Sequence, residues 1–551
     1  MYVAAKLSDK DFAVIKDIRT KEEPEAEFRY EAVAVIHKDL KIDNLQQLKG
    51  LRSCHTGVGR NVGYKIPITK LTNMGILGPM NDPKISAREN ELKALSQFFS
   101  KACLVGKWSP HPEINQRLKS QYSNLCDLCE HPDKCDYPDV NSGYEGSLRC
   151  LADAGGQVAW TKVIYVKKFF GMPYGKKPAE QTNHNPADFA YLCPDASKKP
   201  ITGPPCTWAA RPWPGYMANQ NLASEYKELR EEISKLNDLG ESTHAEWIAK
   251  VLALNNMTVA VDNSPASPMH YLTKAKYMDV IERDFITPKQ VVRICVHDEK
   301  ELKKCEALKT AAFSRDIRPS LSCYKTNSIR DCMQAVKEGK AEVMLVDAQE
   351  AIIGEEVYDL KPIVTEKYGT QTQQQLVAVV KKSSVVQKLE ELKGKKACLQ
   401  PNTKAGYTGT VKILLDKGLI SKTHCPYEKS LTEFFSDVQQ SSDPLNCLAA
   451  DNGDVAFVPF STLHHSEDVE VELLCPSGRK PMGKIEDCNL ATIPPRMIIA
   501  SKSLGQLHMD EVMFSMLAAG DLFNKRPEVY HLFGDFEGEP NVIVSVSLLI
   551  C

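Results

Sequence analysis

The sequence predicts a duplicated α/β protein, in which two related copies of one domain follow each other along the chain. Short runs of Val, Ile, Leu and Ala alternate with segments of helical periodicity, as in sheets that helices cover on both faces. The block Gln47–Cys54 returns as Glu391–Cys398, and the block Leu148–Ala152 returns as Leu445–Ala449. Because the blocks keep their order across the two halves, we interpret them as a duplicated domain and not as a short-period solenoid.

The expected elements follow from these patterns. Buried strands are predicted at Ala32–Ile36, Val291–Cys295, Val343–Val346 and Val377–Val380. Helices are predicted at Arg88–Ser100, Asn219–Asn237, Ala245–Leu254, Ser328–Lys337 and Met509–Leu522. The Pro-rich stretch Ile201–Gly215 is interpreted as an extended surface loop, and the apolar end Val542–Cys551 as a strand. The charged segment Lys274–Lys289 is where one half should end.

Composition narrows the class of protein. A chain of 551 residues exceeds what one hydrophobic core usually holds, so several compact units are expected. The net charge of −2, with both signs interspersed, gives no electrostatic reason for binding nucleic acid. No run approaches the roughly 20 apolar residues of a membrane-spanning helix. We therefore expect neither nucleic acid nor a membrane as a partner.

Eighteen cysteines, several at matching positions in the two copies, favour a disulfide framework and an extracellular protein. Met1–Asp9 shows no signal-peptide pattern, so we expect the chain to begin inside a longer precursor. Cys126, Cys129 and Cys135, with His131 nearby, could also form a zinc knuckle or a redox pair. Disulfides are favoured for them in a secreted chain.

The candidate chemistry lies in the block Cys54–Gly63, where small residues precede a predicted helix start. Backbone N–H groups at such a start, beside the Thr56 hydroxyl and the Arg60 guanidinium, would form an anion site. An ordinary Gly-rich turn is the alternative. Tyr30 opens a buried strand and Tyr144 precedes Cys150. Two tyrosines that converge on an anion site can act as phenolate ligands of a hard trivalent cation.

Three segments together resemble the transferrins, and among them the insect haemolymph type: Phe28–Val35, Ser53–Arg60 and Gly143–Gly146. The resemblance covers nearly the whole chain. It implies a bilobal α/β fold in which each lobe consists of two subdomains, similar to those of periplasmic binding proteins, around a cleft. The lobes would span 1–285 and 290–551, with their second subdomains at about 29–213 and 373–495.

The resemblance also implies Fe³⁺ bound with carbonate as a synergistic anion. Tyr30 and Tyr144 match the two tyrosine ligands. The residues that match the carbonate site are Thr56, Arg60 and the backbone of Val62 and Gly63. The family's histidine ligand falls on Pro214, and its aspartate would precede Met1, so the chain is expected to lack one iron ligand.

The second copy departs further from the family. The aspartate position is kept as Asp347, but the other site positions are occupied by Gln374, Lys404, Ser441 and Arg496. An amide, a hydroxyl and a guanidinium cannot supply phenolate oxygens, so no iron is expected there.

The resemblance further implies disulfide pairs. They are Cys54–Cys150, Cys103–Cys129, Cys126–Cys135, Cys193–Cys206, Cys295–Cys332, Cys305–Cys323, Cys398–Cys447 and Cys475–Cys488. Cys425 is left over, and Cys551 is a candidate partner for it.

The leading hypothesis is a secreted, monomeric iron-transport protein of a haemolymph-like fluid, with one working site and an unidentified cell-surface receptor as a possible partner. The sequon Asn256–Thr258 would allow glycosylation. The alternative is a truncated protein that does not bind iron tightly and acts as an interaction or immune-response module. No nucleophile elbow with a Ser-His-Asp order is found, so no enzymatic activity is expected.

Overall fold

A computed structural model describes most of the chain. The described residues are those of 1–551 other than 8, 176, 286–289, 368–373, 400–408, 422–426, 442, 461–462, 464–469, 483–487, 494, 528, 535, 539–541, 544–547 and 551. Within these ranges, no helix is both long and apolar enough to cross a lipid bilayer. The chain divides into two compact units: Met1–Val292 with Glu306–Ser322 and Gly505–Ala518, and Arg293–Cys305 with Cys323–Leu504 and Ala519–Cys551.

The largest sheet of the first unit has the strand order β4-β3-β5-β2-β6-β7, with β8 beside the start of β2. The strands are β2 (Tyr30–His37), β3 (Arg52–Cys54), β4 (Lys101–Cys103), β5 (Val158–Lys162), β6 (Phe189–Leu192), β7 (Lys198–Pro200) and β8 (Ala209–Arg211). β3 runs parallel to β4 and β5, whereas β2 runs antiparallel to β5 and β6. Val33–Ile36 are fully buried, which confirms the strand predicted there.

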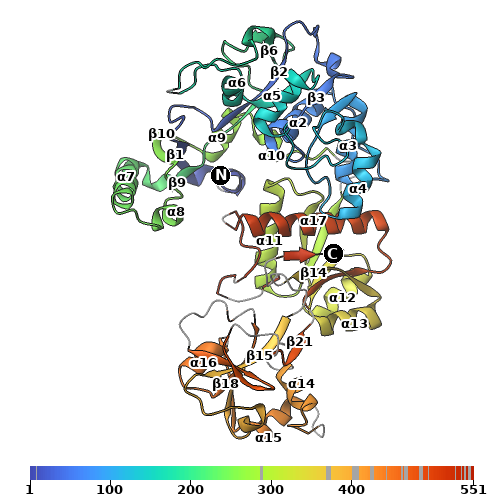
Figure 1. Ribbon diagram of the computed structural model, residues 1–551, viewed down its shortest axis with the longest axis vertical. Coiled ribbons are helices and arrows are strands. Elements are labelled where there is room, and N and C mark those ends of the chain that lie inside the picture. The colour runs from blue at the N-terminus through green and yellow to red at the C-terminus, as the bar shows by residue number, and fades with distance from the viewer. Residues whose placement is uncertain are drawn as a thin grey trace. The chain divides into compact units, whose positions relative to one another are not determined.

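Helices cover this sheet, and Figure 1 shows α5 and α6 beside β2 and β3. They are α2 (Ile66–Asn73), α3 (Ala87–Phe98), α4 (Pro112–Gln121), α5 (Gly143–Asp153) and α6 (Val163–Phe169). A single π-helical turn, η3 (Asn61–Lys65), leads into α2. The helix predicted from Arg88 is therefore confirmed as α3.

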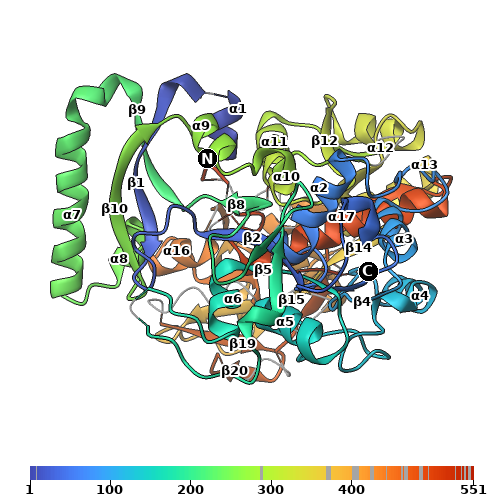
Figure 2. The same cartoon turned by 90° about the horizontal axis from the view of Figure 1, so that it is seen from above.

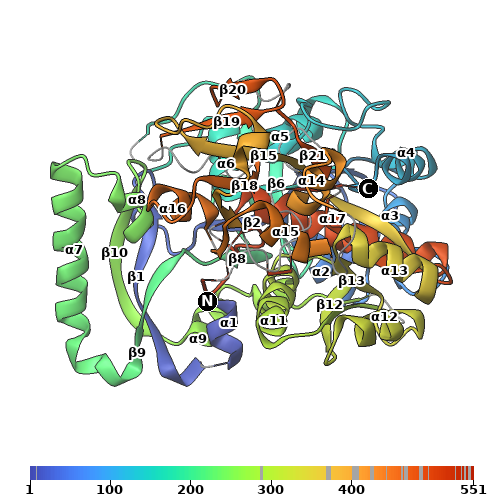
Figure 3. The same ribbon diagram turned by 90° about the horizontal axis from the view of Figure 1, so that it is seen from below.

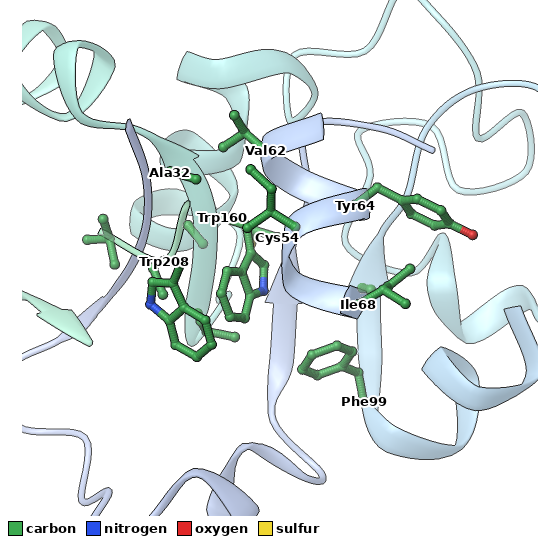
Figure 4. Packing of buried hydrophobic residues seen from close by; sticks show 14 of the residues in the cluster. Ala32, Cys54, Val62, Tyr64, Ile68, Phe99, Trp160 and Trp208 are labelled. Atoms are coloured by element: carbon green, nitrogen blue, oxygen red, sulfur yellow. The ribbon is translucent and has the colours of Figure 1, made fainter. Parts of the chain in front are cut away.

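The prediction for Ile201–Gly215 was wrong. The stretch is not a surface loop, because it contributes β8 to the sheet, and Trp208 and Trp213 within it are each only 2% exposed. The Trp208 ring meets Trp160 edge to face, with 5.0 Å between ring centroids, in the core shown in Figure 4. Burial of two tryptophans outweighs the turn preference of the prolines.

A second, smaller sheet of the first unit has the order β10-β1-β9. Its strands are β1 (Phe12–Thr20), β9 (Gly215–Asn219) and β10 (Thr258–Ala266), and Figure 2 shows the long helix α7 (Tyr226–Ser242) alongside them. The helix predicted from Asn219 starts seven residues later, because Asn219 ends β9 and Gln220–Glu225 forms a 3₁₀ segment. The remaining helices here are α1 (Tyr2–Leu7), α8 (Trp247–Val251), α9 (Pro268–Lys274) and α10 (Met278–Ile281).

The second unit repeats the larger sheet. Its order β17-β16-β18-β15-β19-β20, with β21 beside β15, corresponds strand for strand to the first copy. Figure 3 labels β15, β18, β19, β20 and β21 of this sheet. The strands are β15 (Gln374–Lys381), β16 (Lys396–Leu399), β17 (Asp437–Gln440), β18 (Val455–Pro459), β19 (Val471–Cys475), β20 (Gly478–Lys480) and β21 (Ala491–Ile493), and the helices beside them are α14 (Gly409–Asp416), α15 (Leu431–Phe434) and α16 (Pro444–Ala449). The predicted duplication is confirmed at the level of sheet topology.

The other sheet of the second copy is larger than its counterpart, with the order β12-β11-β13-β22-β14-β23. The elements are β11 (Val291–Val296), β12 (Ser320–Lys325), β13 (Val343–Val346), β14 (Leu360–Lys367), β22 (Met497–Ser501) and β23 (Leu548–Ile550), with α11 (Glu299–Ser314), α12 (Ile329–Lys337), α13 (Ala348–Tyr358) and α17 (Gln506–Lys525). In chain order β14, β22 and β23 correspond to β1, β9 and β10. The described residues of the first copy hold no counterpart of β11, β12 and β13.

All eight expected disulfides are formed, and Cys126, Cys129 and Cys135 are paired as favoured over a zinc knuckle. Cys425 and Cys551 lie outside the described residues.

Candidate metal and anion site

A loop of small and polar residues joins β3 to the helical segment that begins at Asn61. The Nδ1–H of His55 donates to the carbonyl oxygen of Gly63 at 2.6 Å, which closes the loop. A Cβ at Gly63 would lie 2.3 Å from the nitrogen of Thr56 and 2.4 Å from its Oγ1, so the backbone packs directly on Thr56. Thr56 Oγ1 is buried and has no hydrogen-bond partner within the described residues. The loop therefore holds a polar atom that a ligand could satisfy.

Burial keeps His55 neutral. Its side chain is 1% exposed, and burial lowers its pKa from 6.5 to about 4, against the opposing effect of the bond to Gly63. With the proton on Nδ1, the Nε2 lone pair is buried and has no partner among the described residues. The imidazole that closes the loop is therefore uncharged at neutral pH.

Backbone N–H groups point out of the start of this helix. The carbonyl of Arg60, the N-cap residue, accepts from the nitrogens of Tyr64 and Lys65 at 3.0 Å each. The N–H groups of Val62 and Gly63 belong to the first turn, which has no intrahelical acceptors. Such N–H groups carry partial positive charge, so an anion beside them is stabilised.

Arg60 lies on the exposed side of the loop and is held by a tyrosine. Its Nε donates to the hydroxyl of Tyr137 at 2.9 Å, and its guanidinium carbon lies 5.0 Å from the centroid of that ring. The guanidinium therefore has a defined position beside Thr56, whose carbonyl is 3.5 Å from the same hydroxyl.

Tyr144 is attached to the same loop through the start of α5. The Gly143 nitrogen donates to the Thr56 carbonyl at 3.1 Å, and the Cys54–Cys150 disulfide joins β3 to α5 further along. The carbonyl of Tyr144 accepts from Thr161 Oγ1 on β5 at 2.6 Å. These bonds connect the helix that carries Tyr144 to both neighbouring strands.

Tyr30 is the first residue of β2 and is 7% exposed. Its hydroxyl accepts from Asn61 Nδ2 at 2.8 Å. This bond connects Tyr30 to the loop from His55 to Gly63, here called the anion loop. Arg211 on β8 pairs with it across the strands, and its guanidinium lies 5.9 Å from the ring centroid. Tyr30 also helps to raise the pKa of the buried Tyr277, although burial is the main cause of that shift.

The two tyrosines share one electrostatic environment. Burial raises the pKa of Tyr144, the nearby phenol of Tyr30 raises it further, and Arg60 and Arg211 lower it. A buried phenol keeps its proton at neutral pH, so a bound cation is needed to turn it into a phenolate ligand. Two phenols, an unsatisfied hydroxyl, free helical N–H groups and a guanidinium form a donor set suited to a trivalent cation with a planar anion.

Pro214, the position expected for a histidine ligand, offers no side-chain ligand, and its carbonyl accepts from Ile18 on β1 at 2.7 Å.

In the second copy, Gln374 lies on an equivalent element, whereas Ser441 lies between β17 and α16. Gln374 starts β15, as Tyr30 starts β2. Ser441 Oγ donates to the Asp443 carbonyl at 2.8 Å, and the Asp347 carboxylate accepts from the Glu350 nitrogen at 3.1 Å, before α13. The carbonyl of Arg496 accepts from Glu366 at 3.0 Å. Lys404 lies outside the described residues.

Several residues around the site were not among those predicted from the sequence. Asn61 follows Arg60 directly inside the recognised block, so its position was a usable signal. Folding also brings three further residues to the site, and no sequence pattern predicted their contacts with it: Tyr137, Arg211 and Tyr277.

Comparisons with known proteins all point to one family. The family model described as Transferrin matches residues 1–224, 292–442 and 437–547. The chain is 47% identical to a transferrin of Blaberus discoidalis, over 99% of this chain and 84% of that protein. It is 45% identical to a transferrin of Manduca sexta, over 98% and 84%. The solved structure of transferrin 1 from Manduca sexta matches with a TM-score of 0.76 at 44% identity, covering 100% of this chain and 87% of that one.

Proposed function

The chain belongs to the transferrin family of iron-binding and transport proteins, and we propose that it captures Fe³⁺ with carbonate at the first copy alone. The ligands are the phenolates of Tyr30 and Tyr144. The anion is held by Thr56 Oγ1, the Arg60 guanidinium and the N–H groups of Val62 and Gly63. The observation that carries this assignment is the bonding of both tyrosine-bearing elements to one anion loop, through Asn61 and Gly143.

Charge balance supports this ligand set. Two phenolates and one carbonate bring four negative charges, and the ferric ion together with Arg60 brings four positive ones. A neutral assembly of this kind can be covered by protein at a low cost in desolvation. Each partner alone would leave an unpaired charge, so anion and cation bind together.

The chain's own groups supply positioning and no covalent chemistry. Arg60 can offer two parallel N–H groups to a planar oxyanion. Binding of the cation stabilises both phenolates and lowers their pKa. Acid reverses the process, because protonation of the carbonate and of the phenolates removes the negative ligands.

The second copy is proposed to bind no iron. Gln374 and Ser441 stand at the positions of the two tyrosines and cannot become anionic at physiological pH. This copy would then serve as a structural or receptor-facing lobe. The lobes are proposed to span 1–285 and 290–551, in a secreted, monomeric protein.

A ferric titration in bicarbonate tests the proposal. The chain should develop a visible phenolate-to-iron charge-transfer band that saturates near one iron per molecule. Tyr144→Phe and Tyr30→Phe should each weaken binding, whereas Ser441→Ala in the second copy is the matched control and should bind like the unmodified chain. A chain that gives no band belongs instead to the alternative class, a transferrin-like interaction module.

A further inference from the structure

Tyr137 contacts the proposed anion-binding arginine, although it lies outside the recognised motifs and 77 residues from Arg60. Its hydroxyl accepts from Arg60 Nε at 2.9 Å. The ring also stands beneath the guanidinium, 5.0 Å from the guanidinium carbon to the ring centroid. Arg60 is otherwise on the exposed face of the loop, where a long side chain adopts many rotamers.

The surrounding backbone is shaped to admit this tyrosine. A Cβ on Gly57 would lie 2.1 Å from the Tyr137 hydroxyl, and one on Gly106 would lie 3.3 Å from ring atom Cε2. Both glycines have φ values, +129° and +122°, that side chains rarely adopt. The Gly106 nitrogen donates to the Cys135 carbonyl at 3.1 Å. The segment before Tyr137 is therefore bonded to the loop that follows β4.

This contact determines which N–H groups of the Arg60 guanidinium remain available for a ligand. A guanidinium has five N–H groups, one on Nε and four on the two Nη atoms. With Nε donating to Tyr137, the Nη pair is left for a ligand, and two parallel Nη–H bonds match two oxygens of one planar anion.

We propose that Tyr137 is a positioning residue for the anion, which holds Arg60 by Nε and leaves its Nη atoms for bidentate binding of carbonate. This inference rests on the proposed function, since it assigns a role within the same site. Tyr137 touches neither the anion nor the iron in this proposal, and acts only through Arg60.

The test is the bicarbonate concentration that gives half of the maximal ferric band. Tyr137→Phe keeps the ring under the guanidinium and removes only the hydroxyl. We expect it to need about tenfold more bicarbonate, the order of loss seen when an outer partner of a ligand is removed. Tyr174→Phe is the matched control, because Lys168 and Lys177 lie over the Tyr174 ring, 5.1 and 5.5 Å from its centroid, outside the site. It should need no more bicarbonate than the unmodified chain.

A double-mutant cycle separates positioning from general stability. In an Arg60→Lys background there is no Nε–H of a guanidinium to hold, so adding Tyr137→Phe should change the bicarbonate requirement no further. Equal requirements of Tyr137→Phe and the unmodified chain overturn the inference while leaving the proposed function intact. So does a tenfold loss that persists in the Arg60→Lys background.

Calorimetric titration of bicarbonate into the iron-free chain distinguishes failure of the proposed function from failure of the positioning role of Tyr137. If no ferric band forms, yet bicarbonate binds and Tyr137→Phe weakens it, the proposed function fails and the positioning role stands. If bicarbonate does not bind and no band forms, both are wrong.

Discussion

The neutral His55 makes the anion loop sensitive to acid. The pKa of this buried imidazole is about 4 in the folded chain, against about 6.5 in an unfolded one. Because burial lowers the pKa, the folded state resists the proton that the unfolded state accepts. The resulting loss of unfolding free energy is absent above pH 6.5, grows as the pH falls, and is complete below pH 4.

The size of the effect follows from the two pKa values. At pH 5 nearly all unfolded chains carry the proton on this histidine, and few folded chains do. Linkage then gives a loss of about 2 kcal/mol of unfolding free energy between pH 7.4 and pH 5, rising to about 3 kcal/mol below pH 4. Other carboxylates and histidines add their own dependence, so the test is a comparison between variants.

His55→Asn isolates this contribution. The asparagine amide can take the place of Nδ1–H toward Gly63 and does not titrate. We expect the variant to be less stable at every pH, because the contact with Phe99 is lost. Its unfolding free energy should, however, fall by about 2 kcal/mol less between pH 7.4 and pH 5 than that of the unmodified chain.

Tryptophan fluorescence during urea unfolding measures this, since all five tryptophans lie in the first unit. His131→Gln, at a residue whose side chain is 59% exposed, controls for removal of an imidazole. Equal pH-dependent losses in His55→Asn and the unmodified chain would refute the reasoning.

Three further outcomes are expected. Gly63→Ala would place a Cβ 2.3 Å from the Thr56 nitrogen and should abolish bicarbonate-dependent iron binding, whereas Gly78→Ala, with nothing within 4 Å, should bind normally in the same titration. Asn61→Leu removes a donor to the Tyr30 oxygen and should weaken ferric binding about 10- to 150-fold, with a shift of the charge-transfer band, since a hydrogen bond to a charged group contributes about 1.5–3 kcal/mol. Replacing both cysteines of Cys54–Cys150 by alanine releases a link across a sequence separation of 96 and should cost up to about 4.7 kcal/mol in urea unfolding, with no loss of the second unit's own transition.

The sequence predicted the duplicated fold well because both copies kept the residues that build the sheet. Matching cysteines and apolar runs are local signals, and they return as the same strand order in the two larger sheets. The Ile201–Gly215 stretch was misread because its prolines suggested a loop, while Trp208 and Trp213 within it decide its burial.

The site was predictable only as far as its residues cluster along the chain. The loop from His55 to Gly63 is one continuous block, so its anion chemistry could be inferred. Tyr137 reaches Arg60 across a sequence separation of 77, and nothing near it in the sequence indicates that contact. Partners made by folding across strands leave no periodicity to detect.

Both tyrosine-bearing elements and the anion loop are attached to one sheet, through β2, β3 and β5. Their relative positions therefore do not depend on where the smaller sheet lies at any moment. Under the proposed function, the ferric ion would then meet ligands that are already assembled on one sheet. Substitutions in the smaller sheet should consequently leave the rate of ferric capture little changed.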